Sequence, residues 1–287
     1  MAAKMITEVK AGPYTLRGIS LGGVYTSIRV PELDIVLDAG MPIRQFAGAD
    51  HIFLSHGHGD HVGGLPALMG IRGLLSKKAP PKVYLPAQIG DTLQDALGLM
   101  SELQRYDLRV DAVPMKPGDE VQLRPDLFAR AFRTHHPVPS LGYLFLDRVK
   151  KLKAEFRGLP GSEIAARRRA GDDLFQEEER LELAYATDTL IRVLDTAPEI
   201  RNARVLLMEC TFLDDAKSLE ASRAGCHIHL DELLARVDDL NNEVVALMHF
   251  SQLYSPRDVH RILKARCPKA LLDRLVVFAP TSGSWPG

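Results

Sequence analysis

Short apolar or alternating runs, separated by glycine and proline, dominate the first half of the chain. Runs of this kind bounded by turn residues are typical of β-strands. They predict strands at residues 14–19, 27–30, 34–38, 51–55, 82–85, 110–115, 120–123, 127–134 and 142–147. Apolar residues at helical spacing predict two helices between these strands, at residues 62–75 and 89–106.

The second half of the chain repeats this alternation. We expect strands at residues 183–187, 205–208, 244–248 and 275–279, with helices at about 231–237 and 256–265. Two halves that each alternate strands and helices suit a layered α/β sandwich. The chain has 287 residues, nearly two average domains, yet sandwiches of this length often fold as one unit. We therefore expect a single domain over residues 1–287.

One loop carries an unusual density of metal-ligand side chains. The segment Ser55-His56-Gly57-His58-Gly59-Asp60-His61 lies between a predicted strand and a predicted helix. Imidazole nitrogens and carboxylate oxygens are ligands that zinc and similar divalent ions use. Three histidines and one aspartate are too many for one open catalytic metal, and they suit two adjacent ions. The alternative is a polar loop without metal.

Further ligands are expected at other strand ends. His136, Asp188 and His249 each follow a predicted strand, where loops converge. Taken singly, each could be a structural residue that is hydrogen-bonded at the end of its strand. Taken together with the histidine loop they favour a dinuclear centre, in which Asp188 could bridge both ions with its two oxygens.

Composition limits the partners and the compartment. With 36 Lys and Arg against 37 Asp and Glu, the net charge of -1 excludes global attraction to nucleic acid or anionic lipid, so an RNA partner needs a local site. Three scattered cysteines, none in a C-x-x-C pair, indicate a reducing compartment. No apolar run approaches the 18 or so residues of a membrane span. We expect a cytoplasmic protein that is not bound to a membrane.

One such local site is suggested by an uneven charge distribution. Residues 148–169 hold eight basic residues against two acidic ones, and residues 172–182 hold six acidic residues against one basic residue. Taken alone, this pattern favours two interpretations equally: a local binding site, or a solvated, mobile insertion whose two halves partly pair with each other.

Several motifs resemble one known family. Besides the loop from Ser55 to His61, they are Asp34-Ile-Val-Leu-Asp38, His136-Pro-Val-Pro-Ser-Leu-Gly-Tyr143, Lys151-Leu-Lys-Ala-Glu-Phe-Arg-Gly-Leu-Pro-Gly161, Met208-Glu-Cys-Thr-Phe-Leu213, Gly225-Cys-His-Ile-His-Leu230 and His249-Phe-Ser251. The histidine loop resembles the signature of the metallo-β-lactamase superfamily. The other segments are similar to tRNase Z, the tRNA 3'-processing endonuclease, in its short plant-type form. The similarity spans about residues 18–278.

The resemblance implies a metallo-β-lactamase fold, which is an αββα four-layer sandwich. It also implies two Zn²⁺ ions per chain, with Mn²⁺ or Fe²⁺ as alternative ions. It implies that one ion is held by His56, His58 and His136 and the other by Asp60, His61 and His249, with Asp188 bridging. His135 competes with His136, and the spacing to Tyr143 favours His136. Asp38 would hold a ligand imidazole or, equally, be a turn residue. The family pattern is not matched at Thr187, where relatives usually have glycine, or at Leu253, where they have arginine.

The resemblance also implies an activity. The protein would be a zinc-dependent endoribonuclease that removes the 3' trailer of precursor tRNA and leaves a 3'-hydroxyl, with Asp60 orienting the attacking water. His227, oriented by Glu209, would donate the proton to the leaving group. The insertion at about 148–182 would be an exosite for the tRNA, with the basic side chains Lys150, Lys151, Lys153, Arg157, Arg167, Arg168 and Arg169 on its phosphates, and the protein would be a homodimer.

Two other functions compete with this interpretation. One is a hydrolase of the same fold that acts on a small phosphodiester or ester. The other is an RNA-binding protein with a structural metal, which is disfavoured because structural zinc sites are closed sets of four ligands.

Overall fold

The computed structural model of the chain describes residues 6–77 and 79–286. Its first half forms a seven-stranded sheet in which the strands lie in chain order. The strands are β1 (Thr7–Ala11), β2 (Tyr14–Leu21), β3 (Tyr25–Val30), β4 (Ile35–Leu37), β5 (His51–Phe53), β6 (Lys82–Pro86) and β7 (Asp111–Met115). Pairing is antiparallel from β1 to β4 and parallel from β4 to β7.

The second half forms another seven-stranded sheet with the same plan. Its strands are β8 (Glu120–Arg124), β9 (Leu127–Arg133), β10 (Leu141–Leu152), β11 (Phe175–Ala186), β12 (Val205–Glu209), β13 (Val244–Met248) and β14 (Leu275–Val277). Strands β8 to β11 pair antiparallel, and β11 to β14 pair parallel. Both sheets are therefore mixed, and each has a parallel part whose strands end at one edge.

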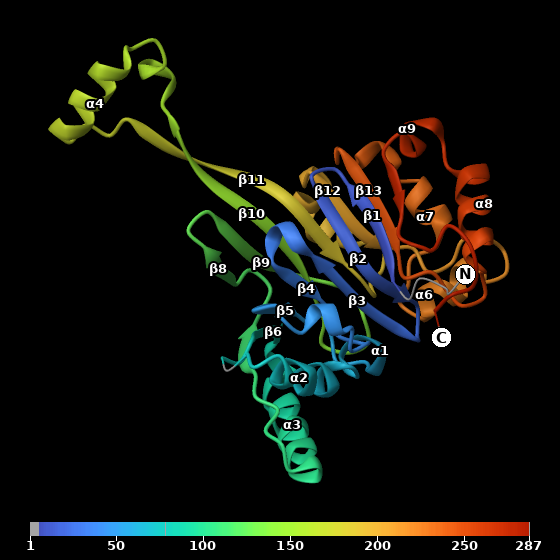
Figure 1. The fold of residues 1–287 in the computed structure, drawn as a ribbon. Helices are drawn as coiled ribbons and strands as arrows, with labels where there is room; N and C mark the ends of the chain where they lie inside the picture. Colours follow the sequence, from blue (N-terminus) through green and yellow to red (C-terminus); the bar gives the residue numbers. More distant parts are fainter. Residues whose placement is uncertain (1–5, 78, 287) are drawn as a thin grey trace.

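Helices cover the outer faces of the two sheets (Figure 1). On the first sheet lie α1 (Gly59–Val62), α2 (Leu65–Leu74) and α3 (Gly90–Gln104). On the second lie α5 (Val193–Thr196), α6 (Leu219–Ala224), α7 (Leu230–Leu234), α8 (Pro256–Arg266) and α9 (Lys269–Leu272). None of the described helices is long and apolar enough to cross a membrane.

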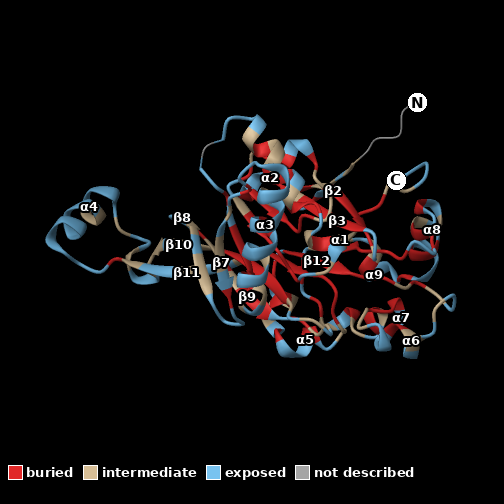
Figure 2. Cartoon of the chain, turned by 90° about the horizontal axis from the view of Figure 1, so that it is seen from below, coloured by how far each residue is buried: buried red, intermediate tan, exposed pale blue. Residues whose placement is uncertain are grey.

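Three hydrophobic cores separate these layers. The middle core joins the sheets and contains buried aromatic side chains such as Phe53, Tyr84 and Tyr143. The outer cores pack α2 and α3 on the first sheet and the C-terminal helices on the second. Figure 2 shows the buried residues gathered within the body of the protein, between these layers. Helix, sheet, sheet and helix form four layers, which confirms the predicted αββα sandwich.

A long two-stranded arm projects from the body (Figure 1). Strands β10 and β11 run on past the end of β9 and stay paired from Arg148 with Glu179 to Leu152 with Phe175. The helix α4 (Gly161–Ala170) lies at the tip, where few residues are buried (Figure 2). The predicted strands at 142–147 and 183–187 are thus the inner parts of longer strands. The outer parts escaped prediction because charged side chains line both of their faces.

Other predicted elements changed in detail. Where one helix was expected at 62–75, α1 ends at Val62 and α2 begins after Gly63-Gly64, with Pro66 in its first turn. A Cβ on Gly64 would lie 2.7 Å from the backbone of Met41, so the chain approaches too closely there for a larger residue. The strand β1 and the helices α4, α5, α6 and α9 were not predicted.

Candidate metal centre

The histidine loop joins β5 to α1 and α2 at the edge where the parallel strands of the first sheet end. Its backbone is fixed on both sides: His56 bridges Ser140 of the other sheet, and the carbonyl of His61 accepts the N–H of Ala39. Gly40 packs so closely on this loop that a Cβ there would lie 1.8 Å from the carbonyl oxygen of Asp60. The loop is therefore held rigidly against both sheets.

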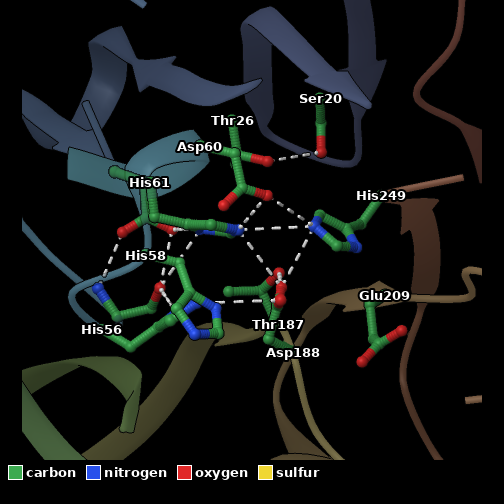
Figure 3. A network of polar contacts seen from close by, with 12 residues as sticks. Ser20, Thr26, His56, His58, Asp60, His61, Thr187, Asp188, Glu209 and His249 are labelled. Atoms are coloured by element: carbon green, nitrogen blue, oxygen red, sulfur yellow. Dashed lines mark hydrogen bonds and ion pairs between the residues drawn. The ribbon is translucent and has the colours of Figure 1, made fainter. Parts of the chain in front are cut away.

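The second sheet brings three more ligand side chains to the same place. His136 follows β9, Asp188 follows β11 and His249 follows β13. Asp188 and His249 have left-handed backbones, with φ of 44° and 60°, which turns each side chain sharply at the end of its strand. The structure thus brings all seven predicted ligands together. Figure 3 labels six of them, all except His136.

The seven side chains form two groups, and the Asp188 carboxylate lies between them. Its Oδ2 lies 3.7 Å from Nε2 of His56 and 3.9 Å from Nε2 of His136. Its Oδ1 lies 3.3 Å from Nε2 of His61 and 3.1 Å from Nε2 of His249. His58 joins the first group, with Nδ1 3.2 Å from Nε2 of His136. Asp60 joins the second, with Oδ2 3.4 Å from Nε2 of His61.

Buried partners orient the ligand imidazoles. Asp38 is fully buried and its Oδ2 lies 2.7 Å from Nδ1 of His61, while Ser55 Oγ lies 3.0 Å from Nδ1 of His56. The hydroxyls of Ser55 and Tyr185 both donate to the Asp38 carboxylate. Asp38 thus holds the imidazole of a predicted ligand, in the arrangement common behind metal-bound histidines. Both rings turn their Nε2 atoms toward the centre.

Charges at the centre perturb its titration. Burial, with the neighbouring His61, lowers the pKa of His56 to about 2. Burial opposes ionisation of Asp188, yet the surrounding histidines, His249 first, outweigh it and hold its pKa far below the ordinary value. The pKa of Asp60 is lowered in the same way against its burial, by the neighbouring side chains of His249 and His61. The carboxylates are therefore ionised and His56 is neutral, which are the forms that bind cations.

One unpartnered atom tests whether these residues fit a metal. Nε2 of His56 is buried, has no hydrogen-bond partner and faces Asp188. A buried polar atom without a partner is costly, and a metal ion would satisfy it. Imidazoles and carboxylates are also a donor set that zinc accepts. The residues present therefore fit two divalent cations.

His227 and Glu209 lie beside the centre without belonging to the predicted ligand groups. Nδ1 of His227 is 3.2 Å from Oε1 of the fully buried Glu209. The ring of His227 stacks on His249 at 5.5 Å, and its side chain is 20% exposed. Burial opposes protonation of His227, but Glu209 outweighs it and raises its pKa to about 9. The ring is therefore accessible and carries a proton at neutral pH.

The neighbouring histidines have other contacts. Nε2 of His135 bonds to the hydroxyl of Thr196, away from the metal ligands. His229 caps α7, with Nδ1 accepting the N–H of Asp231, so its role is structural.

The two departures from the family pattern have different contacts. Thr187 donates from its hydroxyl to Oδ1 of Asp188 at 2.9 Å, and its backbone φ is not positive, so its Cβ causes no strain. Leu253 is 60% exposed.

Sequence reasoning missed three residues of the site, Ser55 as a ring partner, Tyr185 and Thr211. Ser55 and Thr211 lie inside quoted motifs, and Tyr185 lies three residues before Asp188. Their hydroxyl contacts, however, depend on which strand ends the fold brings together.

The seven predicted RNA-binding cations all lie on the arm, far from the centre (Figure 1). Three are paired with acids of the arm: Lys151 with Glu178 at 2.6 Å, Lys153 with Asp173 at 2.7 Å and Arg167 with Glu163 at 3.1 Å. The others form no salt bridge with any described residue; they are Lys150, Arg157, Arg168 and Arg169. The two halves of the insertion therefore pair in part, and four cations stay available.

Two mixed sheets that present a cluster of His and Asp side chains at their edge define a hydrolase of the metallo-β-lactamase class. A family model described as "Beta-lactamase superfamily domain" matches residues 27–250. The chain is 35% identical to tRNase Z TRZ1 of Arabidopsis thaliana over 272 residues, which cover 94% of this chain and 96% of that protein.

Two further relatives agree. The chloroplastic tRNase Z TRZ2 of Arabidopsis thaliana is 33% identical over 88% of this chain and 71% of its own length. The crystal structure of the short form of human tRNase Z superposes with a TM-score of 0.53 at 20% identity, over 86% of this chain and 93% of that one. The chain therefore belongs to the tRNase Z family, which confirms the predicted resemblance.

Proposed function

We propose that this protein is an endoribonuclease that removes the 3' trailer of precursor tRNA by phosphodiester hydrolysis at two zinc ions. The observation that carries the proposal is the Asp188 carboxylate, whose two oxygens face two separate groups of histidines at 3.1–3.9 Å. Such a carboxylate suits a pair of cations. The curated relatives supply the substrate class, because they are named tRNase Z.

The two groups assign the ligands. His56, His58 and His136 would hold one ion, Asp60, His61 and His249 the other, and Asp188 would contact both. Two adjacent cations would lower the pKa of a bound water and neutralise the charge on the phosphate oxygens.

The chain's own residues would handle the protons. Asp60 is partly exposed and its carboxylate faces the second group, where it can accept a hydrogen bond from the attacking water. The leaving ribose oxygen needs a proton, and His227 is the donor because Glu209 holds its Nδ1 and leaves Nε2 free. This assignment leaves a 3'-hydroxyl on the tRNA.

The arm would bind the body of the tRNA as an insertion within one domain. RNA backbone carries a regular array of phosphates, and cations that are not neutralised by protein acids bind it best. Lys150, Arg157, Arg168 and Arg169 meet that condition among the described residues. This explains how a chain of net charge -1 could bind RNA.

Cleavage of a precursor tests the proposal. Purified protein is incubated with a 3'-extended precursor tRNA, with and without a chelator, and the product ends are mapped. We expect one cut at the 3' side of the tRNA body, a 3'-hydroxyl, and loss of cleavage with the chelator. An intact precursor, with rapid turnover of bis(p-nitrophenyl) phosphate, would instead favour a small-substrate phosphodiesterase.

Metal content tests the dinuclear centre separately. Protein purified without chelator should contain about two equivalents of zinc, manganese or iron per chain. His58→Ala should lose metal and activity together. A metal content near zero in the wild-type protein, unchanged after metal is added, would refute the centre.

A homodimer and a cytoplasmic location complete the proposal. The ends of α2 and α3 expose Leu74, Leu99 and Leu103 at 85%, 67% and 79%, and exposed apolar side chains that gather in one region are typical of contact surfaces. Sedimentation equilibrium should show a dimer that Leu99→Glu with Leu103→Glu dissociates. Cell fractionation tests the location.

A further inference from the structure

Thr211 lies where two parallel strands end side by side. Strands β12 and β13 pair in a register that sets Glu209 beside Met248, and Ser251 donates its N–H to the carbonyl of Thr211 at 2.9 Å. The residue just beyond Met248 is His249, so the register brings the Thr211 side chain to this ring. Thr211 is 4% exposed.

The Thr211 hydroxyl has two close polar partners and one distant one. Oγ1 is 2.5 Å from Oε2 of Glu209 and 3.1 Å from Nδ1 of His249. Nδ1 of His227 is farther, at 3.4 Å, and has Glu209 Oε1 at 3.2 Å as a closer partner. The hydroxyl therefore links the ring of His249 to the carboxylate of Glu209.

The other contacts of Glu209 set the direction of this link. Its two oxygens also accept backbone N–H groups from Thr189 at 2.6 Å and Ile228 at 3.2 Å, which can only donate. The Glu209 carboxylate accepts from Thr211 as well, so the single hydroxyl proton of Thr211 points to Oε2 of Glu209. The oxygen lone pairs of Thr211 are then left for His249, whose Nδ1 must carry the hydrogen.

We propose that Thr211 is a positioning residue, which holds His249 in the tautomer whose Nε2 is free to bind a metal ion. In that tautomer the Nε2 lone pair lies on the side of Asp188, whose Oδ1 is 3.1 Å away. Asp38 and Ser55 face the Nδ1 atoms of His61 and His56 directly. Among the described residues, no carboxylate bonds directly to Nδ1 of His249, and Thr211 connects this nitrogen to Glu209. The inference rests on the proposed metal centre.

The first test measures zinc binding by Thr211→Val, which removes the hydroxyl at nearly constant shape, and by Thr211→Ser, which keeps it. Metal-free protein is titrated with Zn²⁺ against a competing chelator. Loss of an outer partner of a ligand typically weakens metal binding about 10–100-fold. In Thr211→Val, we expect that loss of affinity for one zinc equivalent, while the other equivalent binds as in the wild type. Thr211→Ser should bind both zinc equivalents as the wild type does.

The second test reads the tautomer without any metal. Long-range ¹H–¹⁵N correlation spectra of metal-free protein report which ring nitrogen carries hydrogen, and His249→Gln identifies the signal. We expect hydrogen on Nδ1 in the wild type and in Thr211→Ser, and a shift toward Nε2 in Thr211→Val. Circular dichroism checks the fold, and Thr211→Ala replaces Thr211→Val if the latter unfolds.

The results separate this inference from the proposal on which it rests. Wild-type zinc affinity and an unchanged tautomer in Thr211→Val would overturn the role of the hydroxyl. Equal zinc loss in Thr211→Ser and Thr211→Val would also overturn it, because the methyl group would then be what matters. Fewer than two zinc ions on the wild-type protein would instead refute the dinuclear centre.

Discussion

Removing the free cations of the arm should weaken RNA binding without touching the chemistry. The perturbation is the joint change of Lys150, Arg157, Arg168 and Arg169 to Ala, the four predicted RNA-binding cations that form no salt bridge among the described residues. Strand β11 has 12 residues and its inner end leads into Asp188, so at about 3.3 Å per residue the tip lies roughly 36 Å or more from the centre. The metal ligands should therefore be unaffected.

The size of the effect follows from counterion release. Each phosphate contact contributes about 0.7–0.9 to the slope of log K against log salt concentration, so four contacts contribute roughly 3. Between 50 and 200 mM salt, a slope difference of about 3 is a factor of about 60. Wild-type affinity for precursor tRNA should thus fall about 60-fold more than that of the variant over this range.

The control removes charge pairs instead of free charges. Lys151→Ala with Glu178→Ala, combined with Lys153→Ala with Asp173→Ala, leaves the net charge of the arm unchanged because each cation leaves with its partner. Filter binding gives the salt slopes of all three proteins. Turnover of bis(p-nitrophenyl) phosphate reports on the centre, and it should be equal in all of them.

Two results would refute the reasoning. A wild-type salt slope in the four-cation variant would show that these cations do not contact phosphate. An equal loss of turnover on precursor tRNA and on the small phosphodiester would show that the arm supports folding or assembly instead of binding RNA.

Three further predictions concern single sites. His227→Ala should slow precursor cleavage by about 10²–10⁴-fold with unchanged metal content, since it removes a general acid; loss of metal would make His227 a ligand. Arg72→Met should cost roughly 3 kcal/mol of unfolding free energy in urea titrations, because the buried guanidinium donates to the carbonyls of Ala47, Ala49 and Ala79; a loss below 1 kcal/mol would contradict this. The hydrogen bond from Arg72 lowers the pKa of Asp50, so its stabilisation is present above about pH 4, the unfolded value, and is lost as pH falls through the lower folded value. Thermal melts of wild type and Asp50→Asn should therefore differ at pH 7 and converge near pH 3, and a constant difference would contradict the link.

Local patterns were enough to predict a layered α/β sandwich and the candidate ligands of the histidine loop. Strands such as 205–208 and 244–248 are short apolar runs bounded by turn residues, and α8 shows apolar residues at helical spacing, so each pattern reports its own element. His56, His58, Asp60 and His61 could be recognised because metal ligands of one loop lie close together in sequence. The remaining ligands needed the resemblance to the family as well.

Contacts between distant segments could not be predicted in this way. Val149 pairs with Glu178 and Lys150 with Glu177, so the alternation that marks a half-buried strand is absent from the arm and its ribbon went unpredicted. Lys151 lies opposite Gln176 yet forms a salt bridge with Glu178, whereas Lys150 lies opposite Glu177 and forms no salt bridge with a described residue. Which lysine keeps a free charge is therefore decided by the tertiary arrangement of the side chains. The contact of Thr211 with His249 likewise depends on the parallel register of β12 and β13. A single residue carries no signal of such pairings, because register is set by the packing of whole strands.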